Sequence, residues 1–345
     1  MSKKTNGKTK KNGGLRVFLK VVLVILIILL IFFGAVTWYA YSKLSKINYV
    51  KLDNIAINEG VTEQLKGYRN IAIFGIDARA NTYSNSRSDC VIIVSINQDT
   101  NDIKLTSVYR DTYLYIDGHG YDKITHAYAY GGPELAINTL NKNLDLNITE
   151  FVAVNFDAVM DIIDAIGGVS LDVDADELGY MNKYISDINI EMHRNSGKVS
   201  GTGYKDLNGV QALAYSRVRY TAGGDFKRSE RMREVLTATF SKAKSLNLGQ
   251  LNKLADILLP KIYTNVSSTE ILGLLPTIYQ YSMDTGDGWP YENKDYNPGV
   301  YYAAPVTLER NVQKLHENLF GNTGYEVSSK VKEYSQGIIN KTGYR

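Results

Sequence analysis

Three short strings combine carboxylates and guanidiniums, and each stands at one end of an apolar run. They are GIDAR (75–79), SRSD (86–89) and YRD (109–111). The apolar runs beside them have the length and the β-branched content of strands: IAIFG (71–75), CVIIVSI (90–96) and IKLTSVY (103–109). Because α/β proteins carry their chemistry in loops at strand ends, we expect these charged side chains to form part of a functional site.

The acidic members, Asp77 and Asp89, follow and precede successive predicted strands and are expected to converge. Two carboxylates without cysteine or histidine partners suit a hard, oxygen-preferring cation, Mg²⁺ above all, with Mn²⁺ as the alternative. Aspartate is common in loops, however, so the pair alone is a weak signal for a metal site.

Arginines strengthen the signal, because a guanidinium binds phosphate oxygens in bidentate fashion. The alternative to phosphate binding is that these arginines form ion pairs with nearby acids on a solvated surface. A metal flanked by arginines neutralises a pyrophosphate and its phosphoryl-transfer transition state. Arg217 and Arg219 stand two positions apart in YSRVRY (215–220). If this segment is extended, both guanidiniums point to the same side. The arginines in or beside the predicted junctions are Arg79, Arg87, Arg110, Arg217, Arg219, Arg228 and Arg231.

The elements that must position these residues alternate between strands and helices without repeats. Helices are predicted over 133–144, 156–166, 207–215 and 226–246, the last with Asp225 as its N-cap. Asp157, Asp161 and Asp164 share one face of the second helix, as solvated carboxylates or as metal ligands. The remaining predictions are a strand at 169–176, an exposed excursion to about residue 205, amphipathic helices within 248–263 and 269–279, a loop at 284–300 and a helix at 306–321.

The N-terminal segment has a different character. Residues 21–40 contain no charge and are long enough to span a bilayer, so we predict a transmembrane helix at 21–41. A cleaved signal peptide is the alternative, but this apolar run is longer than is usual for one. The basic tail at 1–20 predicts a cytoplasmic N-terminus and an extracellular body, composed of a stalk at 42–67, a domain at 68–324 and a polar tail at 325–345.

Composition excludes several classes of function. The first 20 residues carry seven lysines or arginines and no acid, so the net charge of +3 hides a body of net charge −4, unsuited to nucleic acid. A single cysteine, Cys90, excludes a cysteine metal cluster and an intramolecular disulfide. The four histidines show no zinc-binding spacing.

A set of ordered strings within residues 68–324 resembles the LytR-CpsA-Psr family of cell-wall glycopolymer ligases. The strings are GIDAR, SRSD, SVYRDTYL, KITHAYAYGGP, NFDAVMDIIDAIGGV, YSRVRY and GDFKRSER. The resemblance implies an α/β/α layered domain around a twisted mixed sheet. It also implies transfer of a phospho-glycan, of teichoic acid or capsule type, from a polyprenyl pyrophosphate in a hydrophobic cleft to a peptidoglycan hydroxyl. Helices 133–144, 155–166 and 207–215 are candidates for the cleft wall.

Matched position by position, the resemblance implies that Asp77 and Asp89 hold Mg²⁺ against the pyrophosphate. Arg87, Arg110, Arg217, Arg219 and Arg228 would contact phosphate oxygens, with Arg79 and Arg231 also assigned to this group. Arg110, Asp225 and Arg228 are the predicted catalytic residues, Asp225 either orienting arginines or helping to deprotonate the acceptor. Lys123 is assigned to the pyrophosphate site, with support of that site as its expected role. The family usually carries Gln where this chain has Met232.

Two other functions remain open on the sequence. A hydrolase of lipid pyrophosphates would use the same metal and arginines but activate water. A non-catalytic regulator would bind the prenyl lipid without reaction. The sequence therefore predicts a single-pass protein of a Gram-positive-type cell membrane, with a phosphotransferase domain outside the cell.

Overall fold

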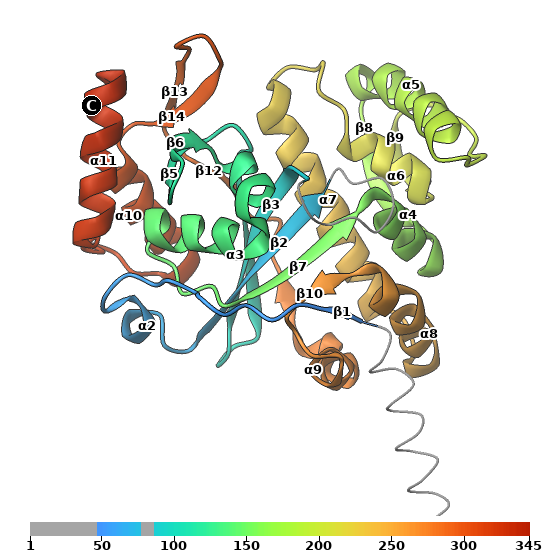
Figure 1. The fold of residues 1–345 in the computed structure, drawn as a ribbon. Helices are drawn as coiled ribbons and strands as arrows, with labels where there is room; N and C mark the ends of the chain where they lie inside the picture. The colour runs from blue at the N-terminus through green and yellow to red at the C-terminus, as the bar shows by residue number, and fades with distance from the viewer. Residues whose placement is uncertain (1–46, 77–85) are drawn as a thin grey trace, which may run out of the picture. The chain divides into compact units, whose positions relative to one another are not determined.

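The computed structural model describes residues 47–76 and 86–345, and residues 47–345 belong to one compact unit. In the described part of the chain, eight strands form one mixed sheet, in the order β1-β10-β7-β2-β3-β4-β11 with β12 also beside β4 (Figure 1). The strands are β1 (Asn48–Tyr49), β10 (Tyr263–Thr264), β7 (Glu150–Asn155), β2 (Tyr68–Ile76), β3 (Ser88–Asn97), β4 (Asp102–Val108), β11 (Ser282–Met283) and β12 (Asp287–Trp289).

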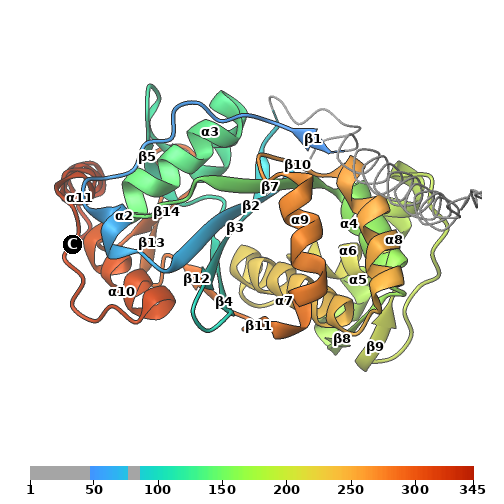
Figure 2. The same cartoon turned by 90° about the horizontal axis from the view of Figure 1, so that it is seen from below.

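The three predicted strands form the centre of this sheet, because their apolar residues serve both faces. On one face, Phe74 and Ile93 join a core with helices α3 (Ile124–Leu144), α10 (Leu308–Phe320) and α11 (Ser329–Thr342). On the other face, Ile92 and Leu105 pack with α7 (Gly224–Lys244). Figure 2 shows α3 and α7 on opposite sides of the sheet. The predicted α/β fold with helices on both faces of a mixed sheet is confirmed.

A third apolar cluster, distinct from the two that cover the sheet faces, lies beyond the end of β7. Met160, Ile163 and Ile185 are buried in it. Its elements are α4 (Phe156–Ala165), β8 (Val169–Val173), α5 (Ala175–Glu191), β9 (Gly203–Leu207) and α6 (Gly209–Ser216), with α7 and α8 (Leu248–Leu258) packed alongside. The helices predicted at 156–166 and 207–215 are therefore present, within two residues of their expected bounds.

Smaller elements complete the described chain. They are α2 (Val61–Gln64), β5 (Tyr113–Ile116), β6 (Gly120–Lys123), η1 (Leu259–Lys261), α9 (Ser268–Leu274), η2 (Leu275–Gln280), β13 (Asn293–Tyr296) and β14 (Tyr302–Pro305). Helix α3 is interrupted by non-helical backbone at Gly131 and Gly132, and the second has a positive φ of 63°. The predicted helix at 133–144 is thus the second half of a longer, kinked one.

The exposed excursion predicted between the strand at 169–176 and residue 205 is wrong, because residues 175–191 form α5. A reciprocal capping box joins Asp174 and Glu177 at its start. Met181, Ile185 and Ile188 then form a narrow buried stripe at helical spacing. Polar residues lie between these buried positions, so the amino-acid composition of the segment does not reveal the stripe.

The predicted boundaries of the domain are also too narrow at both ends. The predicted polar tail contains α11, whose Val331, Tyr334 and Ile338 are buried in the same core as β2. At the other end, Val50 and Ile57 pack against that core, although they fall in the predicted stalk. The segment at 284–300, predicted as a loop, contributes β12 and β13.

The predicted transmembrane helix at 21–41, the basic tail and the start of the stalk lie outside the described residues. Within residues 47–76 and 86–345, no helix is long and apolar enough to cross a membrane.

Candidate active site

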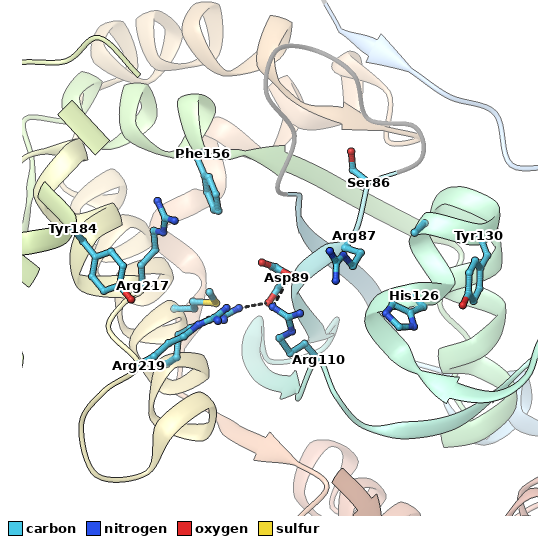
Figure 3. A pocket seen from close by; sticks show the side chains of 13 residues that line it. Ser86, Arg87, Asp89, Arg110, His126, Tyr130, Phe156, Tyr184, Arg217 and Arg219 are labelled. Atoms are coloured by element: carbon cyan, nitrogen blue, oxygen red, sulfur yellow. Dashed lines mark hydrogen bonds and ion pairs between the residues drawn. The ribbon is translucent and has the colours of Figure 1, made fainter. Parts of the chain in front are cut away.

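A cavity of about 740 Å³ collects side chains from both halves of the chain (Figure 3). Five of the predicted arginines, Arg87, Arg110, Arg217, Arg219 and Arg228, line it together with Asp89. The other lining residues are Ser86, His126, Ala129, Tyr130, Phe156, Tyr184 and Met232. The segment around residues 86–110 and the segment at 217–232 therefore meet at a single site, as the resemblance implied.

Asp89 is the point at which the two halves are joined. Its carboxylate Oδ1 lies 2.9 Å from Arg110 Nη1, in an ion pair whose side chains are less than one-fifth exposed. Its backbone carbonyl accepts a hydrogen bond of 2.8 Å from Arg228 Nη2, across 139 positions of sequence. Arg228, which belongs to α7, is only 4% exposed. These contacts therefore hold its guanidinium against the start of β3.

The sheet brings this start of β3 close to the end of β2. A Cβ placed on Gly75 would lie 2.7 Å from the Cβ of Cys90, so only glycine permits this approach. The strand register shifts at the next step, between Gly75 and Ile76. Glycine at the head of GIDAR is thus explained by the close pairing of the two strands that lead into the site.

The sequence predicted Asp225 to be the N-cap of α7, and this prediction is wrong. Gly223 occupies that position with a left-handed φ of 92°, and Asp225 lies in the first turn. Its Oδ1 instead accepts a hydrogen bond of 3.2 Å from Arg228 Nη1 and lies 3.4 Å from Arg219 Nε. These contacts suit the first of the two roles predicted for Asp225, the orientation of arginines, and its part in catalysis stays a prediction.

Arg217 adopts helical backbone at the C-terminus of α6, so the segment YSRVRY is not extended at this point. Arg217 and Arg219 nevertheless both line the cavity. The Arg217 guanidinium carbon lies 5.3 Å from the ring centroid of Phe156 and 5.5 Å from that of Tyr184. Such cation–π contacts restrain a long side chain without neutralising its charge.

Two cations predicted to contact the pyrophosphate do not line the cavity. Arg231 is 1% exposed, and its Nε lies 2.6 Å from Oε1 of the buried Glu177. Its other nitrogens donate to the carbonyl of Val218 and the hydroxyl of Thr221. The prediction for Arg231 is wrong because its donors are consumed in holding the turn that follows Arg217.

Lys123 likewise supports the site from outside. Its Nζ lies 2.8 Å from Asp111 Oδ1, and the same oxygen lies 3.8 Å from Arg110 Nε. The lysine thus helps to orient the acid behind Arg110, which agrees with its expected supporting role.

Asp77 and Arg79 fall outside the described residues, so their predicted roles stay predictions. The stripe of Asp157, Asp161 and Asp164 is not a metal site: Arg194 bridges the first two, Lys261 binds Asp161, and Asp164 accepts from the backbone N–H of Gly209. Those carboxylates are paired with cations and backbone, instead of being merely solvated.

Several lining residues were not predicted to belong to the site. Tyr184 lies in α5, which was predicted as an exposed excursion, so no signal pointed to it. Phe156 falls in the helix at 155–166, a candidate for the cleft wall, but it was not singled out as a site residue. His126 and Tyr130 stand within the string KITHAYAYGGP, where proximity to Lys123 was the available signal.

The charges of the cavity favour an anion. Five guanidiniums face one lining carboxylate, Asp89, with Asp225 behind two of them. No group of three or more metal-ligating side chains occurs in the described residues. Asp89 supplies one oxygen ligand of the kind that Mg²⁺ prefers, and the Mg²⁺ site stays a prediction because Asp77 falls outside the described residues.

Comparison with known proteins agrees with this architecture. The LytR_cpsA_psr family model matches residues 35–317, and the chain belongs to that family. A polyisoprenyl-teichoic acid–peptidoglycan teichoic acid transferase, TagT of Bacillus subtilis (strain 168), is 33% identical over 89% of this chain and 94% of its own length. The transferase TagU of Bacillus cereus (strain ATCC 14579) is 32% identical, over 86% of this chain and 96% of its own.

Two solved structures share the fold. One is described as TagT bound to LIIa-WTA, with a TM-score of 0.60 and 30% identity over 81% of this chain and 96% of that one. The other is described as YwtF (TagT) with bound octaprenyl pyrophosphate lipid, with a TM-score of 0.53 and 26% identity over 86% of this chain and 97% of that one.

Proposed function

We propose that this protein is a phosphotransferase that moves an anionic glycopolymer from a polyprenyl pyrophosphate carrier to a hydroxyl of peptidoglycan. The observation that carries the proposal is the cavity in which Arg87, Arg110, Arg217, Arg219 and Arg228 surround Asp89. Relatives of nearly the same length are named as teichoic acid transferases, and a structural neighbour is described with a bound prenyl pyrophosphate. Teichoic acid is thus the first glycopolymer to test, and capsule the second.

The arginines bind the pyrophosphate and stabilise the charge that develops on it. Arg110 and Arg228 are held in place by Asp89 and Asp225, so that they need little reorganisation when the substrate arrives. Asp89, with Asp77, would hold Mg²⁺ or Mn²⁺ against the same anion. When bound, the cation supplies Lewis-acid neutralisation of the phosphate oxygens.

The transfer itself exchanges one P–O bond for another. The acceptor hydroxyl oxygen attacks the phosphorus nearest the sugar, and its proton passes to a base. The bond from that phosphorus to the bridging oxygen breaks, and polyprenyl phosphate leaves with the electron pair. The family resemblance points to N-acetylmuramic acid as the residue that carries the acceptor.

A second cavity suits the apolar part of the carrier. It measures about 430 Å³ and is lined mainly by apolar side chains, including Ile96, Ile103, Phe240, Leu274 and Ile278. Ile96 lies seven residues along β3 from Asp89, roughly 23 Å at about 3.3 Å per residue. We place the far end of the isoprenoid tail in this second cavity, on the α7 side of the sheet.

This path changes the expected cleft wall. The helix at 133–144 packs on the opposite sheet face, so α7, α9 and η2 replace it. The change Leu274→Glu, at a side chain 37% exposed, should weaken binding of a long polyprenyl diphosphate and leave geranyl diphosphate binding unchanged. Equal weakening for both lengths would contradict the path.

The proposed location is the outer face of the cell membrane, with residues 21–41 as a single anchor and residues 1–20 in the cytoplasm. The uncharged run and its basic N-terminal flank support this orientation. Protease added to intact cells should cleave the body of the protein and leave an epitope tag at residue 1 protected. Protection of the body would contradict the orientation.

The activity is tested with the full-length protein in detergent, a polyprenyl-diphosphate-linked saccharide and a peptidoglycan oligosaccharide. Transfer of the phospho-saccharide to the acceptor should require Mg²⁺ and stop with EDTA. Release of free phospho-saccharide at an unchanged rate without acceptor would identify a hydrolase. Donor binding without any product would instead identify a non-catalytic regulator.

A further inference from the structure

A histidine paired with a half-buried carboxylate lines the arginine cavity. His126 Nδ1 lies 2.8 Å from Asp122 Oδ2, and the two side chains are 27% and 17% exposed. Tyr130 donates to the same oxygen at 2.8 Å, and the backbone N–H of Lys123 donates to the other at 2.7 Å. Asp122 is therefore held by three donors and in turn fixes the imidazole.

The backbone places this histidine beside the reactive strand ends. The hydroxyl of Thr125 donates to the carbonyl of Ser88 at 2.9 Å, and its N–H donates to the carbonyl of Arg110 at 3.2 Å. The N–H of Ile124 donates to the carbonyl of Thr112 at 3.0 Å. Helix α3 thus starts directly on the segments that carry Asp89 and Arg110, and His126 lies in its first turn.

The hydrogen bond with Asp122 decides which nitrogen of His126 is free. Because a carboxylate accepts, it favours the tautomer with the proton on Nδ1 and leaves a lone pair on Nε2. Figure 3 shows the ring among the side chains that line the cavity, between Arg87 and Tyr130 in that view.

We propose that His126 is the general base of the transfer, taking the proton of the acceptor hydroxyl on Nε2, and that Asp122 is the positioning residue of this pair. The inference rests on the proposed phosphotransfer function. The acceptor oxygen bonds to the sugar-proximal phosphorus, polyprenyl phosphate leaves with the electrons of the broken P–O bond, and the imidazolium returns its proton to water. A positioned base of this kind typically contributes about 10²- to 10⁴-fold in rate.

The groups around His126 keep its carboxylate partner in the charged form. Asp122 stays ionised because, although burial favours its protonated form, hydrogen bonds from His126, Tyr130 and the Lys123 backbone lower its pKa. The charged and titratable groups around His126 are Asp122 from β6, Tyr130 from α3, His119 stacked on Tyr130, Tyr302 from β14 beside Asp122, and Arg87, Arg110 and Asp89 across the cavity.

The test compares single-turnover transfer by the full-length protein between pH 5 and 9. The wild-type rate should fall toward the acidic end of this range, because a protonated imidazole cannot take the proton of the acceptor. The variant His126→Asn keeps a donor toward Asp122 but lacks the base, so it should lose about 10²- to 10⁴-fold in rate at pH 8 and lose the acidic limb. Asp122→Asn should displace that limb and lower the rate to a smaller extent.

Donor binding and folding separate this role from a structural one. His126→Asn should bind the donor with the wild-type Kd and give the wild-type circular dichroism spectrum. The matched control is His193→Asn, at an exposed histidine that does not line the cavity and whose positive φ of 51° asparagine also tolerates. It should keep the wild-type rate and pH profile.

A wild-type rate or an unchanged pH profile in His126→Asn would overturn the assignment of the base. Weakened donor binding at an unchanged maximal rate would overturn it too, because it would make His126 a binding residue. If the wild type itself transfers nothing, the proposed function fails. That result is distinct from an active wild type with an equally active variant.

Discussion

Arg231 Nε lies 2.6 Å from Glu177 Oε1, and the two side chains are 1% and 3% exposed. This ion pair joins α7 to α5 in the interior. Since Arg231 also donates to Val218 and Thr221, it fixes the turn that contains Arg219. The second arginine of the GDFKRSER string therefore serves the site through structure and not through contact with the cavity.

Breaking this pair should be costly. Arg231→Met leaves Glu177 as a buried charge without its partner, and we expect a loss of about 3–5 kcal/mol in the free energy of unfolding. The matched control is Lys227→Met, which breaks an exposed pair with Glu230 on the same helix and should cost less than about 1 kcal/mol. Urea unfolding measures both, and equal losses would contradict the structural role.

Arg110→Ala should abolish transfer while the protein still folds. Arg110 lines the cavity and pairs with Asp89, so its loss removes a guanidinium that would contact the pyrophosphate. We expect transfer to fall by at least about 10²-fold, as when one preorganised donor is removed from a transition state. Arg310→Ala, at an exposed arginine of α10, is the control and should be fully active. Retained transfer in Arg110→Ala would refute the assigned role.

Met232→Gln should strengthen donor binding. Met232 lines the cavity at the position where the family usually has Gln, and the amide would add a hydrogen-bond donor beside the arginines. A gain of about 1 kcal/mol, roughly fivefold in Kd, is typical of one such bond. Met232→Leu controls for the change of shape and should leave Kd unaltered. Unchanged or weaker binding in the Gln variant would show that Met232 does not face the donor.

Asp161→Asn should flatten the loss of stability in acid. Burial raises the pKa of Asp161, but the ion pairs with Lys261 and Arg194 outweigh it and hold the pKa below its ordinary value. The pKa of Asp161 is lower in the folded protein than in the unfolded chain, where it is about 3.9. Ionised Asp161 therefore stabilises the fold above that pH, and this stabilisation is lost as the pH falls through the folded-state pKa. The melting temperature between pH 6 and pH 3 should therefore fall less in the variant. An identical decrease in both proteins would contradict the pairing.

Ile338→Ala should destabilise the whole domain. Ile338 is 1% exposed in α11 and packs in the core that includes the central sheet. The change leaves a cavity, and we expect it to lower the free energy of unfolding by about 2–5 kcal/mol. Lys332→Ala on the exposed side of the same helix is the control and should stay within about 0.5 kcal/mol of wild type. Similar values for the two variants would indicate that α11 is dispensable.

Much of the central sheet was predictable from local pattern. Strands β2, β3 and β4 carry long β-branched runs, and α4 has its apolar residues at helical spacing, so each shows its type without help from neighbours. Helix α5 was missed because its buried stripe is narrow and most of its surface is polar. Helix α11 was missed because only packing against α10, α3 and β5 distinguishes its three buried apolar residues from those of an ordinary polar tail.

The sequence by itself determined which residues were available for chemistry and, through the order of its strings, the family to which the chain belongs. Tertiary structure decided which of them share a cavity. Arg228 and Arg231 are three residues apart on one helix, yet one contacts Asp89 and the other is buried against Glu177. The reason is physical: a helix presents successive side chains to different neighbours, and only the packing of α5, α7 and β3 determines which neighbour each arginine meets.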